Sequence, residues 1–110
     1  MRHKSLFNPT CSAVLLTLTL ALPAAAADIS VGQRLAASCA SCHGATGVSA
    51  TGALASLAGQ SRETLVASMR AFKDGSRPAT IMHQLSKGYT DEQIELIAAY
   101  YAAQKNTGAK

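Results

Sequence analysis

The run Cys39-Ala40-Ser41-Cys42-His43 constrains this chain more than any other feature of its sequence. Two cysteines stand three positions apart, and a histidine follows the second at once. Thiols at this spacing form thioethers with the two vinyl groups of one porphyrin, while the adjacent imidazole reaches the iron from one face. The run therefore predicts one covalently attached haem c, bound through Cys39 and Cys42, with His43 as an axial ligand of the iron.

The two cysteines have four other interpretations. A thioredoxin-like dithiol sits where a strand enters a helix, and no strand pattern surrounds this motif. A zinc site built from Cys39 and Cys42 needs two further ligands, and the sequence holds no second cysteine pair and no spaced histidine pair. A plain disulfide, or a chance match, leaves His43 without a role. The dithiol and the disulfide stay open as the main alternatives to haem attachment.

The first 27 residues have the layout of a secretory signal peptide. Arg2, His3 and Lys4 precede an uncharged apolar run, and alanines after Pro23 lead to a small-residue cleavage site after Ala27. The alternative is a retained membrane anchor, but the apolar run is shorter than the ~20 residues that cross a bilayer. We therefore expect export to the periplasm and no membrane span once the signal peptide is removed.

Residues 28–110 are then expected to form one monohaem domain. A segment of this size is small for a self-sufficient apolar core, and a covalently bound haem supplies a centre for it. The third cysteine, Cys11, leaves with the signal peptide, so no thiol remains for a disulfide framework. Lysines and arginines are spread singly without interleaved aromatic residues, so we expect no binding of nucleic acid.

Every periodic segment of the expected domain is helical, which predicts an all-α fold. Apolar residues recur at helical spacing from residue 28, from 61 to 73 and from 90 to 105. Asp28 or Ser30 is suited to cap the start of the first helix.

Two later helices carry start signals, and the first carries an unusual glycine. Ser61 is suited to cap the second helix, and Thr90 with Gln93 predicts a capping box at the last. Gly32 lies on the apolar face of the first helix, where glycine costs about 1 kcal/mol relative to alanine. We therefore expect Gly32 to permit close approach of another element.

The second axial position of the iron needs a methionine, a histidine or water. Met69 lies on the apolar face of an expected helix, where methionine commonly fills the core. Met82 lies in a segment that Pro78 holds away from regular helix, where a loop can cross the haem face. We therefore favour Met82 as the second axial ligand. His83 is expected at the surface near the haem edge, although a bis-histidine centre stays open.

Four runs carry a family resemblance, and similarity of this kind spans nearly all of the expected domain: residues 39–44 (CASCHG), 56–60 (SLAGQ), 72–82 (FKDGSRPATIM) and 87–94 (KGYTDEQI). They resemble the small class I c-type cytochromes, and within these the cytochrome subunit of flavocytochrome c sulfide dehydrogenases. The resemblance implies a compact helical fold in which the first and last helices cross. It implies that Gly32 approaches Tyr100 or Tyr101, and that His43 and Met82 are the axial pair.

The chain departs from this family pattern at Ala55. Relatives usually carry an Ile-Pro-Xaa-Leu run here, in which a backbone carbonyl accepts the ring N–H of the haem-ligating histidine. Here the run is Leu54-Ala55-Ser56-Leu57. The carbonyl survives the change, so the hydrogen bond is still expected, without the rigidity of proline.

The expected function is one-electron transfer, with both axial positions of the iron held by the protein, so we do not expect an enzyme. The resemblance implies that electrons come from a flavoprotein subunit that oxidises sulfide. A free carrier that delivers electrons to a respiratory oxidase or similar acceptor is the alternative. Other classes that stay open are a haem enzyme or gas sensor with an open sixth position, and a thiol oxidoreductase. Arg62, Lys73, Arg77 and Lys87 are candidates for docking a redox partner.

Overall fold

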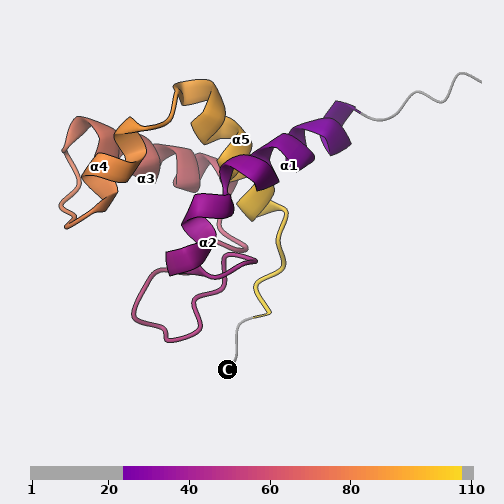
Figure 1. Cartoon of the computed structure of the whole chain (residues 1–110), viewed down its shortest axis with the longest axis horizontal. Helices are drawn as coiled ribbons and strands as arrows, with labels where there is room; N and C mark the ends of the chain where they lie inside the picture. The colour runs from indigo at the N-terminus through magenta and orange to yellow at the C-terminus, as the bar shows by residue number, and fades with distance from the viewer. Residues whose placement is uncertain (1–23, 108–110) are drawn as a thin grey trace, which may run out of the picture.

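The computed structural model describes residues 24–107, with side chains from residue 28 onward. These residues form five helices and no strand, which confirms the predicted all-α class (Figure 1). The helices are α1 (Ala24–Leu35), α2 (Ala37–His43), α3 (Arg62–Asp74), α4 (Met82–Lys87) and α5 (Asp91–Ala102). The predicted signal peptide falls almost entirely outside the described residues and stays a prediction.

Helix α1 begins earlier than the sequence predicted. Its first residue is Ala24, so Asp28 and Ser30 lie inside the helix and neither caps its start. Alanine has the most favourable helix propensity, which explains why the helix runs through the alanines before Asp28. The helix breaks at Ala36 and resumes as α2, which carries the whole cysteine–histidine motif.

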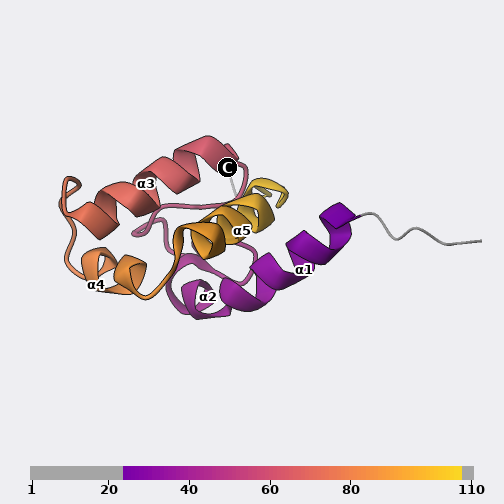
Figure 2. The ribbon, with the colours of Figure 1, turned by 90° about the horizontal axis from the view of Figure 1, so that it is seen from above.

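Helix α5 is the centre of the core. It packs against both α1 and α3, and the view from above shows it between them (Figure 2). Ile94 and Tyr101 of α5 are fully buried. The hydroxyl of Tyr101 donates a hydrogen bond to the carbonyl oxygen of Ala36, 3.2 Å away, and burial raises the pKa of this hydroxyl so that it keeps its proton. This bond ties α5 to the break between α1 and the motif helix.

The crossing of α1 and α5 depends on Gly32, as the sequence predicted. A Cβ at this position would overlap the carbonyl oxygen of Leu96 and would lie 3.0 Å from the Cβ of Tyr100. Any side chain here would therefore push α1 away from α5. Glycine lets the two backbones approach, which explains its presence inside a helix.

Both predicted helix caps are present. The Ser61 hydroxyl accepts the backbone N–H of Thr64 at 3.1 Å, at the start of α3. At the start of α5, Thr90 Oγ1 accepts the N–H of Gln93 at 3.2 Å, and Gln93 Oε1 accepts the N–H of Thr90 at 2.9 Å. Helix α5 ends at Ala102, about one turn before the predicted end.

The segment after α3 differs from the sequence prediction. Residues 75–81 are irregular, as Pro78 indicates, but Met82 is the first residue of α4 rather than part of a loop. Proline restricts the backbone angles of its own residue and of the residue before it. A short helix can therefore begin four residues later. The Ser86 hydroxyl donates to the carbonyl oxygen of Met82 at 2.7 Å inside this helix.

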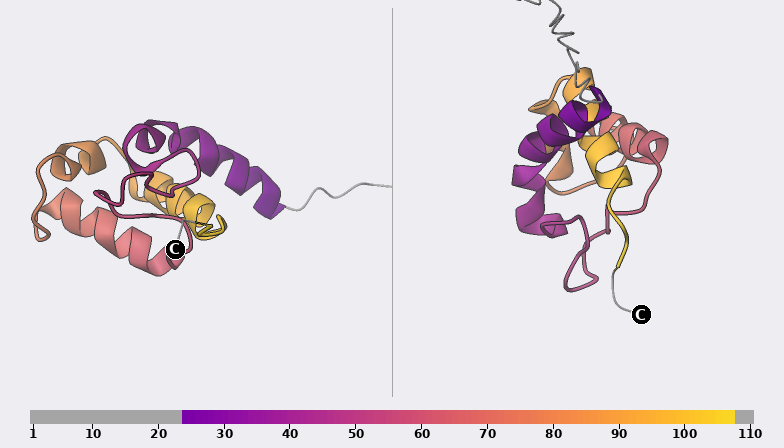
Figure 3. Two further views of the ribbon diagram at one scale, coloured as in Figure 1. Left: turned by 90° about the horizontal axis from the view of Figure 1, so that it is seen from below. Right: turned by 90° about the vertical axis from the view of Figure 1, so that its right-hand side faces the viewer.

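The connection from α2 to α3 lies against α5, as the view from below shows (Figure 3). Gly47 has a φ of 80° and lies so close to Tyr101 that a Cβ would be 2.6 Å from the tyrosine ring. This packing holds the connection, including Leu54 to Leu57, beside the motif helix. Among the described helices, none is long and apolar enough to span a membrane.

Candidate functional site

One cavity of about 370 Å³ lies between α2, the connection to α3, and helices α3, α4 and α5. Its lining is mainly apolar. Leu54, Ile81 and Leu85 are the most exposed large apolar side chains of the described residues, at 45%, 56% and 44%, and all three line this cavity. Apolar surface gathered around a concave site indicates a ligand or partner that covers it.

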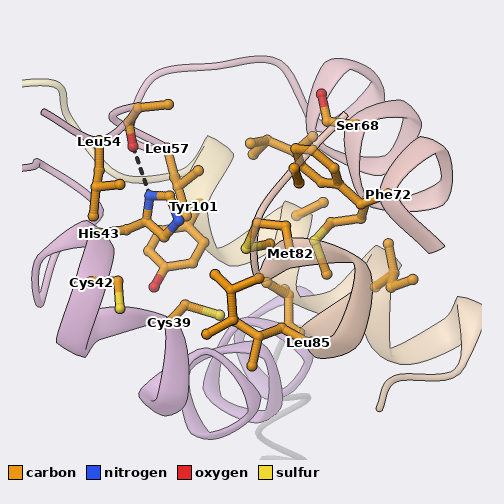
Figure 4. A pocket seen from close by; sticks show the side chains of 18 of the residues that line it. Cys39, Cys42, His43, Leu54, Leu57, Ser68, Phe72, Met82, Leu85 and Tyr101 are labelled. Atoms are coloured by element: carbon orange, nitrogen blue, oxygen red, sulfur yellow. Dashed lines mark hydrogen bonds between the residues drawn. The ribbon is translucent and has the colours of Figure 1, made fainter. Parts of the chain in front are cut away.

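The motif residues share one wall of the cavity. Cys39, Cys42 and His43 all line it from α2 (Figure 4). Spacings of three and four residues place side chains on the same face of a helix, which explains why the motif acts from one side. No disulfide joins the two cysteines. Burial raises the pKa of the Cys39 thiol.

The His43 ring is oriented by the backbone of Ala55. His43 Nδ1 lies 2.8 Å from the Ala55 carbonyl oxygen. A carbonyl only accepts hydrogen bonds, so Nδ1 carries the proton and donates it, which leaves the lone pair on Nε2. Figure 4 shows this second nitrogen on the cavity side of the ring. The hydrogen bond expected without a proline is therefore present.

Two methionines line the cavity. Met82 enters it from α4, across from the wall formed by the motif, and is half-buried (Figure 4). Met69 also lines it, from α3. Sequence reasoning assigned Met69 to ordinary core packing and did not place it at the site. Leu65 and Phe72, which share a helix face with Met69, also line the cavity. Their helical spacing was therefore the sequence signal that could have placed Met69 at the site.

His83 is not among the residues that line the cavity. Its Nε2 lies 2.8 Å from the carbonyl oxygen of Arg77, and its ring packs edge-on against Phe72 with 6.4 Å between centroids. The side chain is half-buried rather than a free surface residue. This arrangement disfavours a bis-histidine centre.

Arg77 has a different place from the one predicted for a docking charge. It is the only lysine, arginine, aspartate or glutamate among the described residues that line the cavity. Its Nη1 donates to the Ser68 hydroxyl at 2.7 Å, and its guanidinium carbon lies 4.7 Å from the centroid of the Phe72 ring. No periodic pattern pointed to this role, because Arg77 lies in the irregular segment before α4.

Two other candidates for docking are held in ion pairs between α3 and α5. Arg62 Nε lies 3.0 Å from a carboxylate oxygen of Glu95. Lys73 Nζ lies 3.1 Å from a carboxylate oxygen of Asp91 and 2.8 Å from the carbonyl oxygen of Tyr89. These charges therefore serve the packing of the two helices.

Comparison with known proteins decides what this arrangement is. The sequence profile of the family described as Cytochrome c matches residues 29–104. The chain belongs to the cytochrome c family. The predicted relation to the small c-type cytochromes is thereby confirmed, and with it haem c as the covalently bound cofactor. The residues present fit this group, because two thiols, an imidazole and apolar side chains face one cavity.

Curated cytochromes from three bacteria are similar to this chain. Cytochrome c4 of Pseudomonas aeruginosa is 41% identical over 99 residues, which cover 89% of this chain and 49% of that protein. The cytochrome subunit of sulfide dehydrogenase from Chlorobaculum tepidum is 44% identical over 70 residues, which cover 64% of this chain and 63% of that protein. Cytochrome c-554(548) of Halomonas halodenitrificans is 36% identical over 83 residues, which cover 73% of this chain and 100% of that protein. This cytochrome thus spans about half of the first relative and under two thirds of the second.

The family relation also sets the class of function. The names of the relatives are those of a cytochrome and of the cytochrome subunit of a dehydrogenase. This chain therefore carries the cofactor of an electron-transfer protein.

Proposed function

We propose that this cytochrome is a periplasmic one-electron carrier with a six-coordinate haem iron held between His43 and Met82. In this proposal Cys39 and Cys42 bind the haem through thioether bonds. One observation carries it: both thiols and the His43 ring line one wall of the cavity, and Met82 lines the wall across from them. The haem supplies an iron that alternates between the ferric and ferrous states.

The protein residues set the properties of this site. The hydrogen bond from His43 Nδ1 to the Ala55 carbonyl fixes the ring orientation and makes Nε2 a stronger ligand. A methionine ligand favours the ferrous state relative to a second histidine, which suits a protein that accepts electrons. With His43 and Met82 both bound to the iron, no position would be open to a substrate. This proposal therefore separates the protein from a haem enzyme or a gas sensor.

The same proposal assigns residues 1–27 to a signal peptide cleaved after Ala27, and residues 28–110 to the monohaem domain. The support is the order of a basic start, an apolar run and a small-residue site in the sequence. The amino-terminal sequence of the purified protein tests this part, and a first residue upstream of Asp28 contradicts the assigned cleavage site.

The electron donor that we propose is a flavoprotein subunit that oxidises sulfide. The support is the similarity to the Chlorobaculum tepidum cytochrome subunit, which is 44% identical over the matched residues. Isolation from the native source should yield a complex with a flavin-containing chain. A haem protein that elutes alone contradicts the complex and favours the free carrier.

The two methionines of the cavity provide a matched test of the axial ligand. We expect the ferric protein to show a methionine-to-iron charge-transfer band that Met82→Ala abolishes and Met69→Ala preserves, because Met82 is the proposed ligand and lies across from His43. Ferrous Met82→Ala should bind carbon monoxide, which the unaltered protein should bind at least tenfold more weakly. In all three proteins the haem should resist extraction by acidified acetone.

Two outcomes contradict this proposal. A charge-transfer band that disappears in Met69→Ala and persists in Met82→Ala assigns the ligand to α3. A haem that acidified acetone removes from the unaltered protein excludes thioether bonds at Cys39 and Cys42.

A further inference from the structure

We propose that Arg77, held in place by Ser68 and Phe72, binds a propionate carboxylate of the haem. The inference rests on the proposed haem site, because the propionates belong to that group. It assigns to Arg77 a binding role at the cavity, in place of the docking of a partner protein.

The position of Arg77 on the cavity wall is the first support. In haem the two propionates leave the porphyrin from the half opposite the two vinyl groups. The motif cysteines on α2 hold the vinyl half, so the carboxylates meet the part of the wall away from α2. Ser68 and Phe72, the two side chains that Arg77 contacts, lie across the cavity from Cys39 and Cys42 (Figure 4).

The charge of Arg77 is the second support. An ionised carboxylate beside an apolar wall is costly unless a cation or hydrogen-bond donors meet it. Within the described part of the chain, no acidic side chain pairs with Arg77, whereas Arg62, Arg70 and Lys73 all form ion pairs. The bond to Ser68 uses Nη1 alone. The Nε and Nη2 groups keep N–H donors in the planar arrangement that binds a carboxylate with two hydrogen bonds.

The rigidity of Arg77 is the third support. Its backbone N–H donates to the carbonyl oxygen of Ala71 at 3.0 Å, and its own carbonyl oxygen accepts from His83 Nε2 at 2.8 Å. The guanidinium packs over the Phe72 ring. A side chain fixed in this way loses little conformational entropy when it binds an anion. The same contacts join the proposed anion site to α4, which carries Met82.

Substitution of Arg77 in the haem-loaded protein tests the proposal. In Arg77→Gln we expect the propionate-bending band of the resonance Raman spectrum to shift, because the carboxylate loses its charged partner. We also expect the ferrous-to-ferric ratio at a fixed ambient potential to fall roughly threefold to tenfold, since a nearby positive charge favours the reduced iron. Arg77→Lys keeps the charge and should restore most of the ratio. Lys105→Gln, which removes an exposed charge outside the cavity, is the control and should change neither readout.

Ser68→Ala keeps the arginine and removes the hydroxyl that holds Nη1, so it should shift the same band by less than Arg77→Gln. This variant also provides a test if Arg77→Gln fails to accumulate. An unchanged band and ratio in Arg77→Gln, with covalent haem and the methionine band intact, overturn the role of Arg77 and leave the proposed function standing. Loss of covalent haem from the unaltered protein instead overturns the proposed function itself.

Discussion

At the scale of single residues, the orientation of His43 depends on a backbone atom. The ring N–H bonds the carbonyl of Ala55, so the side chain at position 55 is not part of the interaction. This explains how alanine is accommodated where a proline is usual. The motif predicted three side chains that line one wall of the cavity, because haem attachment needs those residue types. It did not predict the place of Arg77 or of His83, because both depend on contacts with Phe72 that no local pattern encodes.

Replacing Ala55 by proline should stabilise the protein. Ala55 has a negative φ, and its N–H donates no hydrogen bond within the described residues, so proline removes no contact. We expect the free energy of unfolding to rise by about 0.4–1 kcal/mol, because proline reduces the freedom of the unfolded chain. Denaturation with guanidinium chloride measures the difference.

Ala53→Pro is the matched control for this change. The N–H of Ala53 donates to Thr51 Oγ1 at 3.4 Å, so proline at this position removes a hydrogen bond and should give no stabilisation. A loss of stability in Ala55→Pro would show that the backbone at position 55 requires a φ that proline does not adopt.

At the scale of helices, the sequence predicted the caps of two helices but not the bounds of two others. The caps of α3 and α5 were predictable because the capping side chain and its partner lie three residues apart. Helix α4 was not predictable, because six residues are too few for a periodic pattern and Pro78 indicated a loop. The early start of α1 has a local cause, the helix propensity of alanine. It was not predicted because the first helix was expected to begin after the cleavage site at Ala27.

Gly32→Ala should separate α1 from α5. The added methyl group would overlap the carbonyl oxygen of Leu96. Because the backbone on both sides is helical, the overlap can be relieved only if the two helices move apart and repack. We expect a loss of about 3 kcal/mol in the free energy of unfolding. Gln33→Ala, on the exposed side of the same helix, should change stability by less than about 0.5 kcal/mol. Equal stability of the two variants would contradict the close approach at Gly32.

At the scale of the whole molecule, the side chains of the core surround the cavity rather than fill it. Leu54, Ile81 and Leu85 keep large exposed fractions while they line it. Ile94 and Tyr101 of α5 are buried against the other helices and also line it. The haem is therefore expected to supply the central part of the core, as the small size of the domain indicated.

Removing the covalent attachment should disrupt the whole fold. In the double variant Cys39→Ser and Cys42→Ser we expect loss of covalent haem, loss of near-ultraviolet circular dichroism and faster cleavage by proteases, because the apolar lining becomes exposed to water. Ser41→Ala, between the two cysteines, is the control and should keep both the haem and the fold. A double variant that stays folded and resists proteases without haem would show that the helices suffice for stability.

The sequence by itself determined the cofactor, the helical class and the reason for Gly32, and it predicts Cys39 and Cys42 as the attachment residues. Each of these follows from residue types at short, fixed spacing or from the cost of a glycine in a helix. Only the tertiary structure decided that Met82 begins a helix across from His43, that Met69 shares its cavity, and that Arg77 faces the same space. These residues are brought together by α5 and by the packing of the chain around the cavity, and contacts between distant segments leave no periodic trace in a sequence.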